Sequence, residues 1–147
     1  MNYHFRELNL GDIKAIDSLF SKVFNYRSNT RLLEWKYFEN PYGHAVLIGA
    51  FQGKKLVASG AMIPEKINLL GEKKIVYKCT DLMTHPGHQR RSLSTKVNSL
   101  LLEHKKIKSS AFTYTLCSKV ATKSFLKNNW KHLDSIYNYF KPALFIK

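Results

Sequence analysis

The chain has few acidic residues for its size. Its 147 residues include 10 Asp and Glu against 24 Lys and Arg, so the formal net charge is +14. This balance favours polyanionic partners such as nucleic acid, a phosphorylated cofactor or an acidic membrane surface. The basic residues are spread along the chain in short clusters. A solvated basic surface is therefore the simpler interpretation, and a dedicated nucleic-acid site is not favoured.

Cysteine and long apolar runs are also scarce. Cys79 and Cys117 lack metal-ligand spacing and are too few for a disulfide framework, so we expect no metal site and two reduced, buried thiols. No segment has the length needed to span a bilayer, and residues 1–14 lack the apolar middle of a signal peptide. We therefore expect a cytoplasmic protein without a membrane span, and one domain over residues 1–147.

Apolar periodicity predicts a mixed α/β (α+β) domain with a central sheet. Asn9 and Asp12 match a capping box before the first helix, Thr30 is the expected cap of the second, and Ser118 that of the last. Turns are expected at Gly53-Lys54 and Gly71-Glu72. Helices are predicted over 11–24, from 30 to about 39, from 93 to a basic turn at 105–108, and over 118–127, with Ala121, Phe125 and Leu126 facing inward. Strands are predicted over 3–8, 45–51, 56–63, 75–83, 111–116 and 130–140, with Ile67 flanking the second turn.

The most informative segment is 81–97. An apolar run stops at Pro86, a short basic turn with one glycine follows, and a helical pattern begins at Leu93. A strand that leads through a turn into a helix N-terminus presents unpaired backbone N–H groups to a phosphate. Arg90 and Arg91 add charge-assisted donors. The segment therefore predicts a cofactor that carries a pyrophosphate.

Two spaced motifs carry a resemblance to a known family. Residues 84–86 (Thr-His-Pro) and 89–94 (Gln-Arg-Arg-Ser-Leu-Ser) occupy the places of its first signature. The second signature is matched in spacing by Ser118, Ala121, Phe125, Asn129 and Trp130. The chain resembles the GNAT family of acyl-coenzyme A-dependent N-acetyltransferases, and residues 33–43 are similar to a subgroup linked to bacterial cell-surface sugar modification. The resemblance implies a mostly antiparallel sheet flanked by about four helices.

The resemblance also implies acetyl-CoA as cofactor and direct attack of a primary amine on the thioester. Backbone at Leu82 to Thr84 would pair with the pantetheine arm as an added strand, and an amide near Met83 would polarise the thioester carbonyl. The cofactor-binding residues implied in this way are Leu82, Met83, Thr84, Gln89, Arg90, Arg91, Ser92, Leu93, Ser94, Thr95 and Ser118.

The chain departs from the family pattern most at Ser92 and Phe125, and more mildly at Ser94 and Ser118. Ser92 replaces a glycine, and a Cβ is costly there if the backbone needs a positive φ. Phe125 replaces the tyrosine that often protonates the leaving thiolate in the family, so water or another hydroxyl, Tyr114 or Ser118, becomes the candidate donor. Asp81 is the best-placed general base, with a structural hydrogen-bonding role as the alternative.

The acceptor is less well defined by the sequence. Trp35, Tyr37 and Tyr42 are candidate walls of its pocket, although helical spacing favours core packing for Trp35. His85 and His88 are expected as polar loop residues or phosphate neighbours. A small-molecule amine, such as an amino sugar, is the favoured acceptor. A degenerate domain that binds CoA or an anionic partner without turnover, acylation of an RNA-linked amine, and a homodimer that completes the sheet stay open.

Overall fold

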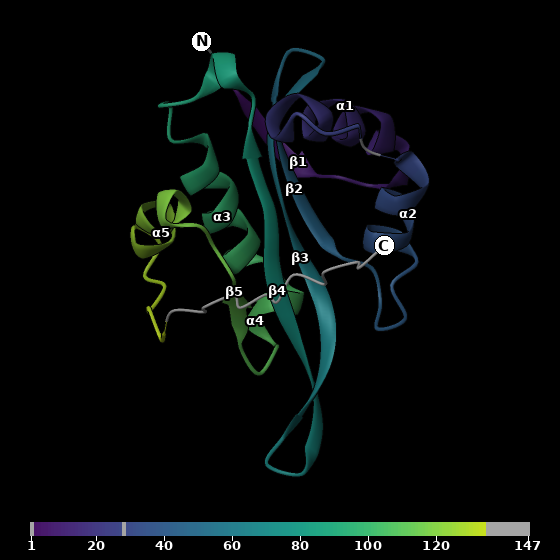
Figure 1. Cartoon of the computed structure of the whole chain (residues 1–147), viewed down its shortest axis with the longest axis vertical. Helices are drawn as coiled ribbons and strands as arrows, with labels where there is room; N and C mark the ends of the chain where they lie inside the picture. The colour runs from purple at the N-terminus through teal and green to yellow at the C-terminus, as the bar shows by residue number, and fades with distance from the viewer. Residues whose placement is uncertain (1, 28, 135–147) are drawn as a thin grey trace, which may run out of the picture.

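A five-stranded sheet forms the centre of the protein. The structure, a computed structural model, describes residues 2–27 and 29–134. The strand order is β1-β2-β3-β4-β5, antiparallel except for β5, which runs parallel to β4. Figure 1 shows β3 and β4 as the longest elements. The strands are β1 (His4–Glu7), β2 (Val46–Gln52), β3 (Lys55–Leu69), β4 (Glu72–Thr84) and β5 (Thr113–Thr115).

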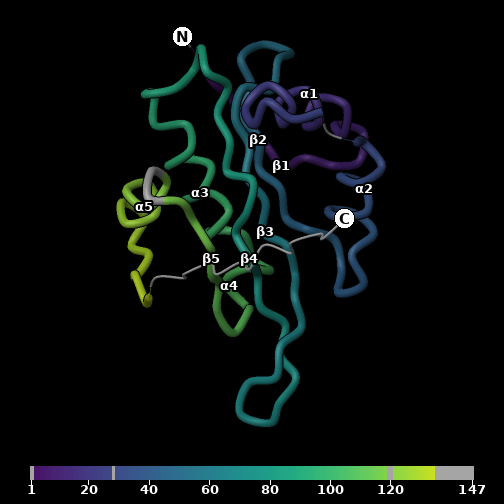
Figure 2. The backbone as a smooth tube through the Cα atoms, viewed as in Figure 1, coloured from purple at the N-terminus to yellow at the C-terminus, as the bar shows by residue number. Residues whose placement is uncertain are grey.

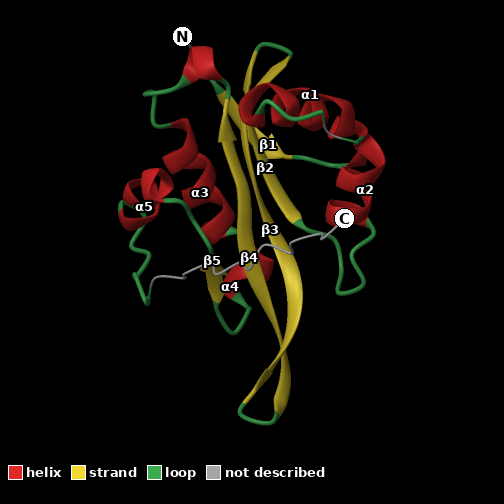
Figure 3. Cartoon of the chain, viewed as in Figure 1, coloured by secondary structure: helices red, strands yellow, loops and turns green. Residues whose placement is uncertain are grey.

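Helices cover both faces of this sheet (Figure 3). On one side lie α1 (Ile13–Phe24), preceded by the 3-10 turn η1 (Leu10–Asp12), and α2 (Thr30–Phe38). On the other lie α3 (Leu93–Glu103) and α5 (Lys119–Leu126), while η2 (Pro86–His88) and the one-turn α4 (Lys105–Lys108) are connections. The mixed α/β class and the mostly antiparallel sheet are confirmed. No helix within the described residues has the length and apolarity to cross a membrane.

The two faces of the sheet have separate cores. Ile16 and Leu19 of α1 and Tyr37 of α2 pack with Ile63 and Met83 on one face. The other face packs a second set of buried residues, which comprises Val46, Ile48, Ala50, Val57, Ala58, Met62, Tyr77, Cys79, Leu93, Val97, Leu101, Ile107 and Phe125. Tyr77 and Cys79 of β4 both face this second core, because every second side chain of a strand points to the same face.

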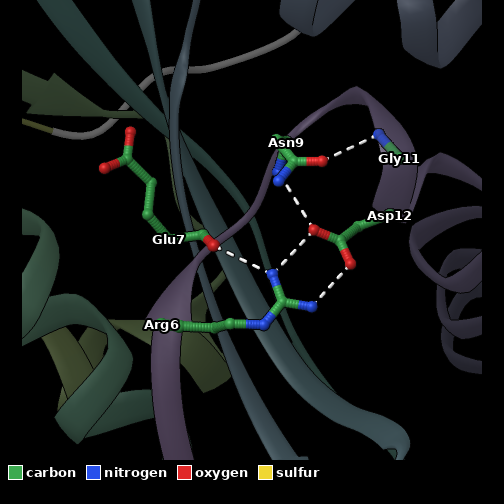
Figure 4. Close-up of polar contacts among 5 residues, drawn as sticks. All are labelled: Arg6, Glu7, Asn9, Gly11 and Asp12. Atoms are coloured by element: carbon green, nitrogen blue, oxygen red, sulfur yellow. Dashed lines mark hydrogen bonds and ion pairs between the residues drawn. The ribbon is translucent and has the colours of Figure 1, made fainter.

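The junction between β1 and α1 is tied by a small polar cluster (Figure 4). The Asn9 side chain accepts from the Gly11 N–H at 2.8 Å, and Asp12 accepts from the Asn9 N–H at 3.0 Å, which confirms the predicted capping box. The Arg6 guanidinium binds both Asp12 oxygens, at 2.6 and 2.8 Å, and holds the pKa of that carboxyl below its usual range. The cluster holds the start of α1 beside the first strand.

Several predicted boundaries are wrong. Asn29, not Thr30, caps α2 by accepting from the Arg31 N–H, and Thr30 instead donates to Asp17. Leu126 is half exposed rather than inward-facing. Residues 130–134 form no strand, and the rest of the strand predicted over 130–140 lies outside the described residues. The basic turn after α3 is the separate helix α4.

The β3–β4 hairpin is longer than predicted and projects beyond the helices (Figure 2). β3 runs unbroken to Leu69, and the turn lies at Leu70-Gly71 rather than Gly71-Glu72. Most residues of this arm are at least partly exposed, so no apolar alternation marked it in the sequence. Both turn residues have positive φ, +52° and +88°, as a type I′ turn requires.

Leu70 is therefore a leucine in a left-handed conformation, with 98% of its surface exposed. We predict that Leu70→Asn raises the free energy of unfolding by about 1 kcal/mol, since asparagine tolerates this conformation and no packing is lost. Urea denaturation measures the change. Gly71→Ala is the control, because a Cβ there meets nothing within 4 Å and tests backbone strain alone; it should destabilise. A Leu70→Asn protein no more stable than the wild type contradicts the prediction.

Candidate functional site

A β-bulge interrupts the pairing of β3 and β4. Ala61 pairs with Thr80 and Ser59 with Met83, so Asp81 and Leu82 lie together opposite Gly60. Asp81 takes the positive φ, +49°, which aspartate tolerates better than most residues. A Cβ at Gly60 would lie 2.9 Å from a Leu82 methyl carbon. Because Gly60 has no side chain, it leaves room for the Leu82 side chain of the bulged strand.

Beyond the bulge, one edge of β4 is left without a strand partner among the described residues. β5 pairs only with Tyr77, Lys78 and Cys79, and residues 80–84 continue past its end. Predicted cofactor contacts at Leu82, Met83 and Thr84 fall on this edge. The Met83 side chain is buried in the core on the α1 side, so its contribution there is its backbone. This free edge is the backbone feature that an extended ligand needs for strand-like pairing.

The edge leads through η2 to the N-terminus of α3. The first intrahelical bond runs from the Lys96 N–H to the Ser92 oxygen at 3.0 Å. The amides of Leu93, Ser94 and Thr95 therefore precede the hydrogen-bonded helix and lie at its positive end. The edge and these amides together fit a ligand with an extended arm and a pyrophosphate, which is the chemistry of acetyl-CoA.

Ser92, the helix N-cap, has φ +56° and makes no side-chain capping bond. The position thus has the conformation that the glycine of the family pattern would adopt without strain. Arg90, two residues earlier, also has a positive φ of +60°. Ser92 therefore adopts the backbone conformation of that glycine, at a conformational cost.

Asp81 is held by the helix α2. Its Oδ2 accepts from the Lys36 ammonium at 2.5 Å and from the Tyr37 hydroxyl at 2.6 Å, and its Oδ1 accepts only a longer bond of 3.3 Å from Thr80. Tyr37 is fully buried, and burial followed by the Asp81 charge raises its pKa well above the ordinary value. The structure thus brings together two sequence candidates, Asp81 and Tyr37, and adds Lys36.

Tyr114 contacts a different carboxylate. Its hydroxyl donates to Glu65 on β3, and Lys78 lies 4.0 Å from the same carboxylate. Tyr77 and Cys79 face the α3 side, so Lys78 between them faces the side of α2, as Asp81 does. Burial, and then the hydrogen bond that Tyr114 donates to Glu65, raise the pKa of Tyr114 to about 12. Sequence reasoning missed Glu65, because only the β3–β4 register places it beside Tyr114.

The remaining candidates are scattered. Trp35 is 55% exposed, so core packing is the wrong expectation for it, and Tyr42 is exposed in the loop after α2. Ser118 is the N-cap of α5 without a side-chain capping bond. Phe125 is buried edge-on against Trp130.

The two cysteines differ from each other. Cys79 is buried as expected, and burial raises its thiol pKa to about 12. Cys117 is exposed, so its predicted burial is wrong. It lies between the short strand β5 and the helix α5. Its sulfur lies 3.5 Å from the Thr122 hydroxyl.

Comparison with known proteins agrees with this geometry. Residues 4–122 match the family model of the acetyltransferase (GNAT) domain, and the chain therefore belongs to the GNAT acetyltransferase family. No curated protein matches the chain.

Solved structures share the fold at low sequence identity. A predicted acetyltransferase from Clostridium acetobutylicum, solved with acetyl-CoA, has a TM-score of 0.74 at 15% identity, with 95% of this chain and 96% of that chain covered. Glucosamine-6-phosphate N-acetyltransferase from Arabidopsis thaliana has a TM-score of 0.71 at 16% identity, with 96% and 100% covered. An aminoglycoside acetyltransferase from an uncultured soil metagenomic sample has a TM-score of 0.73 at 14% identity, with 96% of each chain covered.

The strain at Ser92 can be measured. We predict that Ser92→Gly raises the free energy of unfolding by about 1 kcal/mol, because glycine adopts a positive φ without penalty. Ser92→Ala should leave it nearly unchanged, since the hydroxyl makes no capping bond. Chemical denaturation of the three proteins tests both. A loss of about 1 kcal/mol in Ser92→Ala would show that the hydroxyl caps α3.

The raised pKa of Tyr114 gives a second prediction. The pKa of Tyr114 is about 12 in the folded protein and 10.0 ordinarily. The protonated hydroxyl therefore adds to the free energy of unfolding at neutral pH, and this contribution is lost as the pH rises from 10 to 12. The phenolate absorbance of wild type minus Tyr114→Phe should titrate near 12. Glu65→Gln should lower that midpoint only in part, because burial is the larger cause. An unchanged midpoint in Glu65→Gln would contradict the contact.

Proposed function

We propose that the protein transfers an acetyl group from acetyl-CoA to a primary amine of a small molecule. The observation that carries the proposal is the edge of β4 at residues 80–84, which no described residue pairs with as a strand and which leads to the first-turn amides of α3. Membership of the acetyltransferase family supports the reaction class. The partly exposed Asp81, Glu65 and Lys78 on the α2 side of the sheet support a polar acceptor.

Backbone groups would hold most of the cofactor. The edge at Leu82 to Thr84 would pair with the pantetheine arm, and amides at residues 93–95 would bind the pyrophosphate. Arg90 and Arg91 would add charge, with the Arg91 guanidinium also donating to the Tyr3 hydroxyl at 3.0 Å. When bound, acetyl-CoA supplies an acetyl group activated as a thioester.

Asp81 is proposed as the group that receives the amine proton. Its Oδ2 is occupied by Lys36 and Tyr37, whereas Oδ1 has one long hydrogen bond and keeps capacity to accept another. An acceptor ammonium that binds Oδ1 would be oriented beside the free edge of β4 and could lose its proton there. The Lys36 ion pair keeps the carboxylate anchored while it does so.

Tyr114 is proposed as a hydroxyl donor on the same side of the sheet. Because its pKa of about 12 keeps it protonated at neutral pH, it has a proton to donate. Glu65, Tyr114 and Lys78 also offer acceptors and donors for sugar hydroxyls. An amino sugar is therefore the acceptor class we favour, and two of the structural neighbours act on glucosamine-6-phosphate and on aminoglycosides.

Binding and turnover are tested separately. Acetyl-CoA at a hundredfold excess over its Kd should add about 2.7 kcal/mol of stability. For a domain of this size, that corresponds to a rise in Tm of about 5–10 °C. Release of free thiol across a panel of amino sugars and simple amines then measures transfer. An unchanged Tm with acetyl-CoA would refute the cofactor assignment.

Asp81→Asn separates a catalytic role of this carboxylate from a structural one. We expect thiol release to fall about 100-fold or more with the acetyl-CoA Tm shift retained. Tyr37→Phe is the matched control, since it removes a hydrogen-bond partner of Oδ2 but leaves the carboxylate. Equal losses in both variants would assign Asp81 to holding α2.

A second candidate, a domain that binds CoA without turnover, is favoured by the strained Ser92 and by Phe125 at the place of the family tyrosine. A full Tm shift with acetyl-CoA, together with no thiol release for any amine, would establish it.

A further inference from the structure

A basic groove lies between α1 and the β2–β3 hairpin, beside the end of β4. Its volume is about 550 Å³. In Figure 1 the hairpin tip extends past α1 at the top of the molecule. The groove is lined by Ala15, Ser18, Leu19, Ser21, Lys22, Lys54, Lys55, Leu56 and His85.

The charge of this groove is of one sign. Lys22 comes from α1 and Lys54 and Lys55 from the hairpin, and the described lining includes no aspartate or glutamate. All three lysines are exposed. Like charges from these two segments that line one groove repel one another, and an anion bound between them offsets that repulsion. Ammonium groups of lysine bind phosphate as point charges.

His85 adds a neutral donor to the same groove. Its backbone N–H donates to the Val57 oxygen at 2.8 Å, and its Nδ1 accepts from the Gly87 N–H at 3.1 Å. In the neutral ring that tautomer leaves Nε2 as a donor. Burial, then Lys55, His88 and Lys22, lower the pKa of His85. The positive charges of Lys55 and Lys22 thus favour the neutral form of the imidazole.

The groove lies on the opposite face of the sheet from the start of α3. Leu19 and Leu56 belong to the core on the α1 side of the sheet, whereas Leu93, which opens α3, belongs to the core on the opposite face. The same two leucines, which are 3% and 5% exposed, form the closed floor of the groove. The surface therefore combines cationic groups with an apolar base.

We infer that this groove binds a small organic phosphate other than acetyl-CoA, with the phosphate between Lys22, Lys55 and the His85 imidazole. The inference does not depend on acyl transfer, because the groove needs only to bind. Its ligand is identified by class alone: a phosphate or diphosphate group joined to a compact, partly apolar body.

Inorganic pyrophosphate is the probe for the charged part. Calorimetry at constant ionic strength should show saturable binding to the full chain. Lys22→Gln/Lys55→Gln should weaken that binding about tenfold or more. The control is Lys14→Gln/Lys105→Gln, which removes the same charge from exposed lysines outside the groove. An equal loss in both pairs would show general charge attraction and overturn the inference.

The His85 imidazole gives a second readout by NMR. Bound pyrophosphate should raise the pKa of His85, since an anion offsets the field of Lys55 and Lys22. The titration is repeated with saturating acetyl-CoA. A retained pyrophosphate response supports a separate site, whereas its loss would assign the groove to the cofactor and overturn the inference. Absence of any His85 response to pyrophosphate would do the same.

Discussion

The β-bulge at Asp81 and Leu82 is the constraint on which the site depends. One extra residue in β4 turns the Asp81 carboxylate toward α2, where Lys36 and Tyr37 bind it. A regular strand would continue the alternation of Lys78 and Thr80 and send residue 81 to the α3 side. The bulge thus links the end of β4 to the helix α2.

Backbone strain is concentrated in the same region. Among the described residues, six non-glycine residues have positive φ, and Asp81, Arg90 and Ser92 are three of them. Such conformations are retained where surrounding structure enforces them, and they gather at functional sites. Here Asp81 is held by its ion pair with Lys36, and Ser92 directly precedes α3. The same backbone that exposes the α3 amides therefore lowers the stability of the turn before it.

The distribution of charge has two different local outcomes. Around Asp81 and Glu65, lysines are paired with scarce carboxylates, so these lysines are structural partners. In the groove beside α1, Lys22, Lys54 and Lys55 line a surface to which no described aspartate or glutamate contributes. A net charge of +14 is therefore partly neutralised at the candidate acceptor site and left concentrated at the groove. Composition alone cannot distinguish these two environments.

The sequence alone determined the order of the strands and main helices up to α5, the sheet class, the capping box at Asn9 and the strand–turn–helix that ends in α3. These features follow from local periodicity and from side chains that bond to nearby backbone. Tertiary structure decided the bulge at Asp81, the pairing of Tyr114 with Glu65 and the basic groove. Each of these depends on register or on packing between segments distant in the chain, which no local pattern encodes. The exposure of Leu70 and the burial of the Met83 side chain likewise depend on how distant segments pair and pack.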